Sequence, residues 1–164
     1  MFGQVRGQLV VRARSTSANV QTNNISFILQ VVNDQGAATD LRDLELRYWY
    51  KPGQLGKATQ QVDIDYAAVG AANIKTDITP PDANGLAVLR VRFSDTAGAI
   101  KPYTSSGDIT VRIHKSDWTN YDQRGDFSFK PDNTLSDWDH VALYQGGQLV
   151  WGLEPEPPTA AAGR

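Results

Sequence analysis

The stretch IHKSDWTNYDQRGDFSFK (113–130) holds the residue types whose chemistry is the most suggestive in this chain. Trp118 and Tyr121 stand there among charged and polar side chains, without an apolar pattern around them. An outward indole beside an outward arginine forms a flat, amphipathic surface, on which the C–H face of a sugar ring can stack. By analogy with base stacking, each such ring contributes about 1 kcal/mol. The pattern alone leaves a core position for Trp118 equally open, because tryptophan is usually largely buried.

Catalysis is the alternative chemistry. Asp137 and Asp139 flank Trp138 on one face of a strand, and glycoside hydrolysis needs paired carboxylates. Nothing in the sequence indicates a cleft around them. The two histidines, His114 and His140, give little basis for a Ser-His-Asp site or a His-rich metal site. We therefore predict a binding module with no catalytic residues.

Bulk composition narrows the possible partners. The chain has 164 residues, which suits one domain with a proper core, and a formal net charge of −2. That charge does not favour nucleic acid or anionic membrane as a partner, and no apolar run is long enough to span a bilayer. Zero cysteines exclude disulfides, thiol catalysis and cysteine zinc sites. We expect no nucleic-acid or membrane partner, and a monomer.

Strand-like runs bounded by turn residues recur through the chain, and no long helical periodicity interrupts them. About eight or nine such runs with one-sided alternation predict an all-β fold, in which two antiparallel sheets pack face to face. The predicted strands include 7–14, 25–33, 44–50, 86–94, 108–115 and 126–130, followed by a hairpin over 140–155 that turns at Gly146 and Gly147.

The strand over 108–115 positions the opening stretch. Its alternation turns Ile109, Val111 and Ile113 to the core, so that Thr110, Arg112 and His114 point outward. Trp118 then lies just past that outer face. The other three tryptophans, Trp49, Trp138 and Trp151, are predicted to be buried.

The end of the chain changes character. EPEPPTAAAGR (154–164) is rich in Pro, Ala and Thr and has no core residue. We predict a module over 1–155 and an interdomain linker or tail over 156–164.

Several linked motifs together carry a family resemblance. HKSDWTNYDQRGDFSFKPDNTLSDWDHVALYQGGQLVWGLEP, together with LRDLELRYWY, closely resembles family 3 carbohydrate-binding modules, the cellulose-binding domains of bacterial cellulases and cellulosomal scaffoldins. The similarity covers roughly 8–155 and is strongest from 108 onward. It implies a jelly-roll β-sandwich of about nine strands. It also implies a secreted, non-catalytic module that binds cellulose or a related β-glucan and is covalently linked to catalytic or scaffold domains.

One branch of that family offers an alternative function. Its members are fused tightly to a glycoside hydrolase, extend the catalytic cleft and bind solid cellulose poorly. The intact Trp118 and Arg112 argue against that branch, and so does the flexible-looking tail.

The resemblance also assigns binding residues. It implies a planar strip in which Trp118 and an ion pair of Arg112 with Asp65 stack along a glucan chain. Tyr66 takes the neighbouring position, where the family commonly has His. Asn23 matches a polar anchor for a neighbouring chain. No aromatic residue occurs in VGAANIKTD (69–77), where the family's next ring is expected, so a shorter strip is predicted.

A structural calcium ion is the one cofactor that the resemblance implies. Asp126 matches a carboxylate ligand, and Asp122 is a further carboxylate close by. Gly53 stands where the family's second carboxylate is expected, and Lys51 adds positive charge next to it. The alternative is that Asp122 and Asp126 are solvated turn residues.

Overall fold

Side-chain alternation explains why the apolar runs become strands. In the computed structural model, which describes residues 8–157, β3 (Ile25–Asn33) buries Leu29 and Val31 completely. The residues between them, such as Gln30, lie toward the solvent. β11 (Ile109–Lys115) follows the same period, with its three isoleucine and valine side chains at 0% exposure. Each run therefore gives one face to the core and one to the outside.

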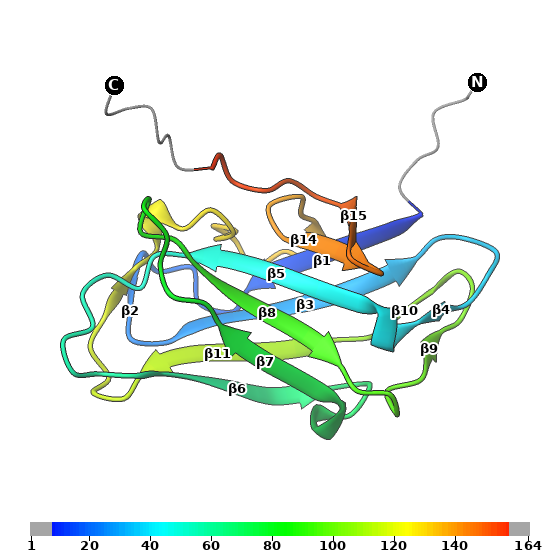
Figure 1. The fold of residues 1–164 in the computed structure, drawn as a ribbon, viewed down its shortest axis with the longest axis horizontal. Helices are drawn as coiled ribbons and strands as arrows, with labels where there is room; N and C mark the ends of the chain where they lie inside the picture. Colours follow the sequence, from blue (N-terminus) through cyan, green and yellow to red (C-terminus); the bar gives the residue numbers. More distant parts are fainter. Residues whose placement is uncertain (1–7, 158–164) are drawn as a thin grey trace.

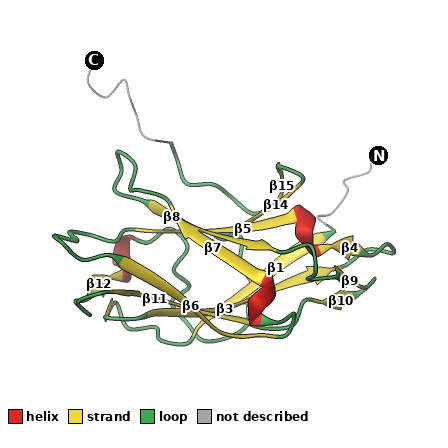
Figure 2. Cartoon of the chain, turned by 60° about the horizontal axis from the view of Figure 1, so that its bottom comes forward, coloured by secondary structure: helices red, strands yellow, loops and turns green. Residues whose placement is uncertain are grey.

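Strands and loops make up nearly all of the described chain, with three short 3-10 turns (Figure 2). Nine of the strands have four residues or more. Besides β3 and β11, the strands are β1 (Leu9–Ser15), β2 (Gln21–Thr22), β4 (Thr39–Asp40), β5 (Leu44–Tyr50), β6 (Gln60–Ala67), β7 (Ile74–Ile78), β8 (Ala87–Phe93), β9 (Ala99–Ile100), β10 (Thr104–Ser105), β12 (Tyr121–Asp122), β13 (Ser136–Asp137), β14 (Ala142–Gln145) and β15 (Gln148–Trp151). The 3-10 turns are η1 (Leu41–Asp43), η2 (Ala71–Asn73) and η3 (Gln123–Gly125).

Two antiparallel sheets pack against each other as a β-sandwich (Figure 1). The first sheet has the order β13-β1-β3-β11-β6, and β10 also pairs with β3. The second has the order β15-β14-β5-β8-β7. β11 therefore lies between β3 and β6, and Arg112 is opposite Ser26 on one side and Asp63 on the other. This confirms the predicted all-β sandwich.

The core fills the space between the two sheets. Phe27 of β3 stacks on Tyr48 of β5, with ring centroids 4.0 Å apart and planes within 3°. Around this pair the inner faces contribute completely buried aliphatic side chains, which include Val11, Leu46 and Leu89. Burial of these side chains from both sheets provides the main stabilisation of the fold.

The tryptophans differ in burial, and the structure decides the position that the sequence left open for Trp118. Trp49 is 7% exposed, and Trp138 and Trp151 pack partly buried against the core. The Trp138 indole donates to the carbonyl of Ser128 (2.9 Å), and the Trp151 indole donates to the carbonyl of Trp138 (3.1 Å). Trp118 is the most exposed of the four, at 48% for the residue.

The structure differs from the predicted strands in two places. Residues 126–130 form turns instead of a strand, and Ser128 is fastened to β5 because its N–H donates to the carbonyl of Trp49 (3.1 Å). β6 and β7 occupy segments in which no strand was predicted. The hairpin of β14 and β15 is confirmed, with Gly146 and Gly147 both at positive φ in its turn.

The end of the described chain follows the second sheet. Leu153 donates its N–H to the carbonyl of Asp139 (2.8 Å), and the Asn84 side chain donates to the carbonyl of Glu156 (3.4 Å). Of the predicted linker, residues 158–164 lie outside the described residues. The boundary predicted at residue 155 therefore stays a prediction.

Candidate functional site

A β-bulge in β6 turns two consecutive side chains outward. Val111 of β11 is opposite Ile64 and Thr110 is opposite Tyr66, so Asp65 is an extra residue without an opposite partner. In a regular strand, consecutive residues point to opposite faces. Here Asp65 and Tyr66 are both exposed, before Ala67 returns to the interior. The bulge thus places a carboxylate and a ring side by side on the outer face of the first sheet.

Asp65 holds the side chain of Arg112 through two hydrogen bonds. Nε of Arg112 donates to Oδ2 of Asp65 (2.8 Å), and Nη2 donates to Oδ1 (3.0 Å). These bonds lower the pKa of the Asp65 carboxyl below its ordinary value and raise that of Arg112. An exposed pair contributes little to stability, so its effect is to fix the planar guanidinium in one orientation.

Trp118 lies flat over the outer face of β11. Its backbone is in the left-handed region (φ 59°), and its N–H donates to the carbonyl of Lys115 (3.0 Å), which turns the chain back over the strand. The indole stacks on the ring of His114, with centroids 3.9 Å apart and an interplanar angle of 2°. His114 is only 6% exposed, whereas Trp118 is 48% exposed. One indole face is therefore covered by the imidazole, while the residue stays about half exposed to solvent.

Asp63 connects the stacked rings to the ion pair. Its Oδ2 lies 3.2 Å from Nε2 of His114 and 3.3 Å from Nη2 of Arg112. The sequence prediction of the site missed both Asp63 and His114. The alternation that turned Arg112 outward also turned His114 outward, and Asp63 precedes Asp65 by one strand period. The spacing was therefore visible, but the contacts depend on side-chain geometry.

The five predicted carbohydrate-binding residues are only partly brought together. Arg112, Asp65, Tyr66 and Trp118 share the outer face along β11 and β6, and we call these four the strip. Tyr66 is 57% exposed, and no hydrogen bond within residues 8–157 ties it to the other three. Asn23 lies exposed in the turn between β2 and β3. Within the described residues, no hydrogen bond or ion pair joins Asn23 to the strip.

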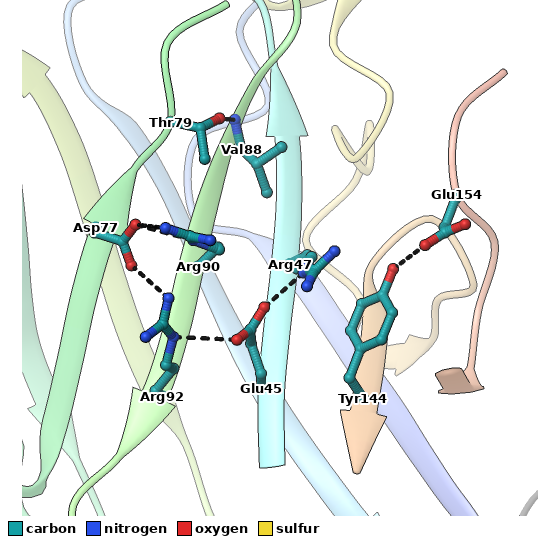
Figure 3. Close-up of polar contacts among 9 residues, drawn as sticks. All are labelled: Glu45, Arg47, Asp77, Thr79, Val88, Arg90, Arg92, Tyr144 and Glu154. Carbon is teal, nitrogen blue, oxygen red and sulfur yellow. Dashed lines mark hydrogen bonds and ion pairs between the residues drawn. The ribbon is translucent and has the colours of Figure 1, made fainter. Parts of the chain in front are cut away.

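The outer face of the second sheet has a different character. A row of alternating charges crosses β7, β8 and β5, and within it Glu45 binds Nε of Arg92 (3.1 Å) and Nε of Arg47 (2.6 Å). The Arg47 guanidinium lies 4.0 Å over the ring of Tyr144, which donates its hydroxyl to Glu154. The residues drawn in Figure 3 show this row of side chains. The three exposed aromatic residues of the described chain, Tyr66, Trp118 and Tyr103, are not part of it.

Comparison with known proteins identifies the family. The family model of the cellulose binding domain matches residues 10–152. This chain belongs to the family 3 carbohydrate-binding modules. The module is 36% identical to endoglucanase A of Paenibacillus lautus and 33% identical to cellulosomal-scaffolding protein B of Acetivibrio thermocellus. Each match covers 92% of this chain, but only 22% of the endoglucanase and 20% of the scaffolding protein.

Solved structures agree with this assignment. The module superposes on a family 3b module of the major scaffoldin subunit of Acetivibrio cellulolyticus with a TM-score of 0.82 and 31% identity, covering 90% of this chain and 97% of that one. With the family 3a module of a Clostridium thermocellum scaffoldin the TM-score is 0.81 at 33% identity, covering 93% and 94%. The chain is therefore a non-catalytic carbohydrate-binding module with the β-sandwich of its family.

The carboxylates considered for catalysis have separate surroundings in the module. Asp137 pairs with Arg12 across β13 and β1 (3.2 Å), and Asp139 lies 3.9 Å from Nε2 of His140. Both carboxylates are well exposed, and each lies beside a basic side chain of its own. These contacts agree with the non-catalytic character of the family.

The predicted calcium ligands are close in sequence but are differently engaged. Asp126 is 7% exposed, and burial raises its pKa to about 7. Its Oδ1 accepts from the Lys51 N–H (2.8 Å), and its buried Oδ2 has no hydrogen-bond partner among the described residues. The Asp122 carboxylate instead binds Arg124, which lowers the pKa of Asp122 to about 2.

These residues, as arranged, do not fit a calcium site. Calcium takes six to eight oxygen ligands, usually with several carboxylates among them. Within residues 8–157 no three acidic or histidine side chains gather around one point. Lys51 and Arg124 line the hollow next to Asp122 and add positive charge, and Gly53 contributes no side chain. The prediction of calcium binding by Asp126 and Asp122 finds no support in this arrangement and stays untested.

No helix within the described residues is long and apolar enough to cross a bilayer.

Proposed function

We propose that this module adsorbs to cellulose through the strip of Trp118, Arg112, Asp65 and Tyr66. The observation that carries the proposal is the Trp118 ring, about half exposed and parallel to a second ring, beside a doubly hydrogen-bonded ion pair. An indole in that position offers its outer face to the C–H face of a glucose ring. The relatives named cellulosomal-scaffolding protein and endoglucanase support a cellulosic ligand.

The ion pair and the rings have complementary roles in this proposal. Trp118 and Tyr66 stack on sugar rings, and the paired Arg112 and Asp65 form a flat polar plate beside them. Because the pair is already joined, the guanidinium does not have to be ordered when the polysaccharide binds. Asn23 contributes a hydrogen bond to a neighbouring glucan chain.

The setting of the module belongs to the same proposal. Its relatives are parts of longer cellulases and scaffolding proteins, so we propose that the module acts as a monomeric unit of a secreted protein with catalytic or scaffold domains. An enzyme tethered in this way would see a raised effective concentration of substrate. Adsorption through the strip would therefore increase degradation of solid cellulose without any chemistry in the module.

A pull-down on microcrystalline cellulose tests the proposal with two matched variants. Trp118→Ala removes the stacking ring, and Tyr103→Ala removes an exposed ring outside the strip. Both residues have positive φ, at 59° and 58°, so the two substitutions place alanine on similar backbone. Loss of one stacked ring should weaken adsorption by about five- to hundredfold for Trp118→Ala. Tyr103→Ala should adsorb as the wild type does.

Circular dichroism and thermal unfolding of the same samples show whether each variant is folded. A folded Trp118→Ala protein that adsorbs as well as the wild type would exclude the strip as the binding surface. Folded wild type that stays in solution would exclude adsorption to crystalline cellulose altogether.

A further inference from the structure

The parallel stack beneath Trp118 assigns a role to a residue outside the strip. We propose that His114 is a positioning residue, which holds the Trp118 indole parallel to the sheet, and that Asp63 fixes the imidazole and joins it to Arg112. The role of His114 deepens the proposed function, because it explains how the strip becomes flat. The adsorption test of this role rests on the proposed function. The stack itself can be tested without cellulose.

The loop that carries Trp118 is anchored independently of its ring. Ser116 donates its N–H to the carbonyl of Thr59 (2.8 Å), and the Thr59 N–H donates to the Ser116 hydroxyl (3.0 Å). Nζ of Lys115 donates to the carbonyl of Asn120 (3.1 Å). These bonds fix the backbone but leave the indole free to rotate about its side-chain bonds. The stack on His114 is the contact that selects one orientation.

His114 is in turn held by groups on both sides of its ring. Nε2 lies 3.2 Å from Oδ2 of Asp63, and Nδ1 lies 3.2 Å from the carbonyl oxygen of Lys115. Both partners are acceptors, so a neutral imidazole donates to one of them at a time, and either bond, together with burial to 6% exposure, restricts tilting of the ring. It therefore offers Trp118 a rigid base.

Asp63 makes the two binding elements parts of one structure. The same Oδ2 atom contacts His114 (3.2 Å) and Arg112 (3.3 Å), and Arg112 continues to Asp65. The contacts run without a break from the indole through the imidazole and carboxylate to the guanidinium. A ring already ordered before binding loses less side-chain entropy when the polysaccharide arrives.

Two substitutions at position 114 separate the stack from the hydrogen bonds. His114→Ala removes the ring on which Trp118 lies, and we expect adsorption about three- to tenfold weaker, because the indole then has to be ordered on binding. His114→Phe keeps a flat ring that can stack without bonding to Asp63. We expect His114→Phe to recover most of the wild-type adsorption, which a loss of general stability would not explain.

His140→Ala is the matched control. His140 stacks on Phe127 with centroids 4.2 Å apart and planes within 8°, outside the strip. Removal of that imidazole should leave adsorption unchanged, whatever it does to stability.

NMR provides the readout that does not involve cellulose. In the wild type, the ring current of the parallel indole should shift the carbon-bound ring protons of His114 upfield, and Trp118→Ala should abolish this shift. In His114→Ala, the Trp118 ring protons should move toward random-coil positions. His114→Phe should retain them near their wild-type positions.

The outcomes distinguish the two proposals. If Trp118→Ala adsorbs like the wild type, the proposed function fails, and the NMR shifts alone then support or overturn the positioning role. Unshifted His114 ring protons, or Trp118 signals that are the same in His114→Ala as in the wild type, would overturn it. Adsorption by His114→Phe as weak as that of His114→Ala would overturn the stack as its cause.

Discussion

Arg112 is held from two sides by carboxylates of the same strand. Asp65 takes two hydrogen bonds from the guanidinium, and Asp63 lies 3.3 Å from it while also contacting His114. Three charged groups and one imidazole on two neighbouring strands thus fix one another. Each pair contributes little to stability on an exposed face, so their shared orientation is the property that matters for binding.

The lowered pKa of Asp65 gives a prediction about pH. A depressed pKa in the folded state means that the contribution of the pair is present above the ordinary value of 3.8 and is lost as the pH falls through the lowered value. We expect the ratio of wild-type to Asp65→Asn adsorption to stay constant from about pH 8 to pH 5 and to approach one only in stronger acid. Binding isotherms at a series of pH values measure this ratio. A ratio that already falls between pH 8 and pH 5 would contradict it.

At the scale of elements, close approaches between strands depend on particular glycines. Gly152 follows β15 at φ 90°, and a Cβ placed there would lie 2.6 Å from the carbonyl oxygen of Val141. Backbone cannot move away as a flexible side chain could. This residue therefore allows the chain to pass directly over the start of β14.

Alanine at position 152 should consequently destabilise the fold more than alanine at a similar but open glycine. We expect Gly152→Ala to lower the free energy of unfolding by about 2–4 kcal/mol, from the steric overlap together with the left-handed backbone. Gly85 has φ 81° and no atom within 4 Å of the added Cβ, so Gly85→Ala should cost only about 1 kcal/mol. Urea denaturation of both variants measures the difference. Equal losses would show that the Val141 carbonyl moves aside.

Among the strands, some could be predicted from the sequence with accurate bounds and others could not be predicted at all. The β-branched, apolar run 25–33 and the alternation in 44–50 predict the observed bounds of β3 and β5, because such runs mark strands that pack on a core. β6 was not predicted as a strand, because its bulge interrupts the alternation and its few apolar residues lie among Gln and Asp. Phe127 and Phe129 suggested a strand over 126–130, but the segment forms turns in which Phe127 packs edge-on against Trp49.

The candidate site was likewise only partly predictable from the sequence. The exposure of Trp118 was left open by the pattern, and its proposed role came from motif spacing shared with the family. The stack on His114 could not be predicted, because it depends on a left-handed residue that returns the ring over the strand. Similarly, the spacing of Asp122 and Asp126 in the sequence does not show that the Asp122 carboxylate forms an ion pair with Arg124.

Over the whole molecule, the two outer faces of the sandwich are specialised differently. The first sheet displays Trp118 and Tyr66 around an ion pair, and the second displays charges that neutralise one another. The buried Asp126 has no hydrogen-bond partner for its Oδ2 among the described residues, and no group of three acidic or histidine side chains gathers there. We therefore predict that the core and the internal hydrogen bonds, without a bound calcium ion, stabilise the fold.

Thermal unfolding with and without calcium tests that conclusion for the whole module. A ligand that binds the folded state raises the unfolding midpoint as its concentration increases. Because the arranged residues do not fit calcium, we expect the same midpoint in excess chelator and in millimolar calcium chloride. A midpoint that rises with calcium concentration, and does so less in Asp126→Asn, would show that the loops rearrange to bind the ion.

The bulge in β6 has a consequence for insertions and deletions. Ile64 pairs with Val111 and Tyr66 with Thr110, so the strand on either side of Asp65 already has the phase of an uninterrupted ladder. Loss of this single codon would close the ladder and leave every core side chain on its own side of the sheet. Loss of Tyr66 would also close the ladder, with Asp65 opposite Thr110, whereas loss of Ile64 would place Asp65 opposite Val111 on the core face. Conversely, one residue inserted at this point of a regular strand adds the carboxylate that binds Arg112 and leaves the core side chains in place.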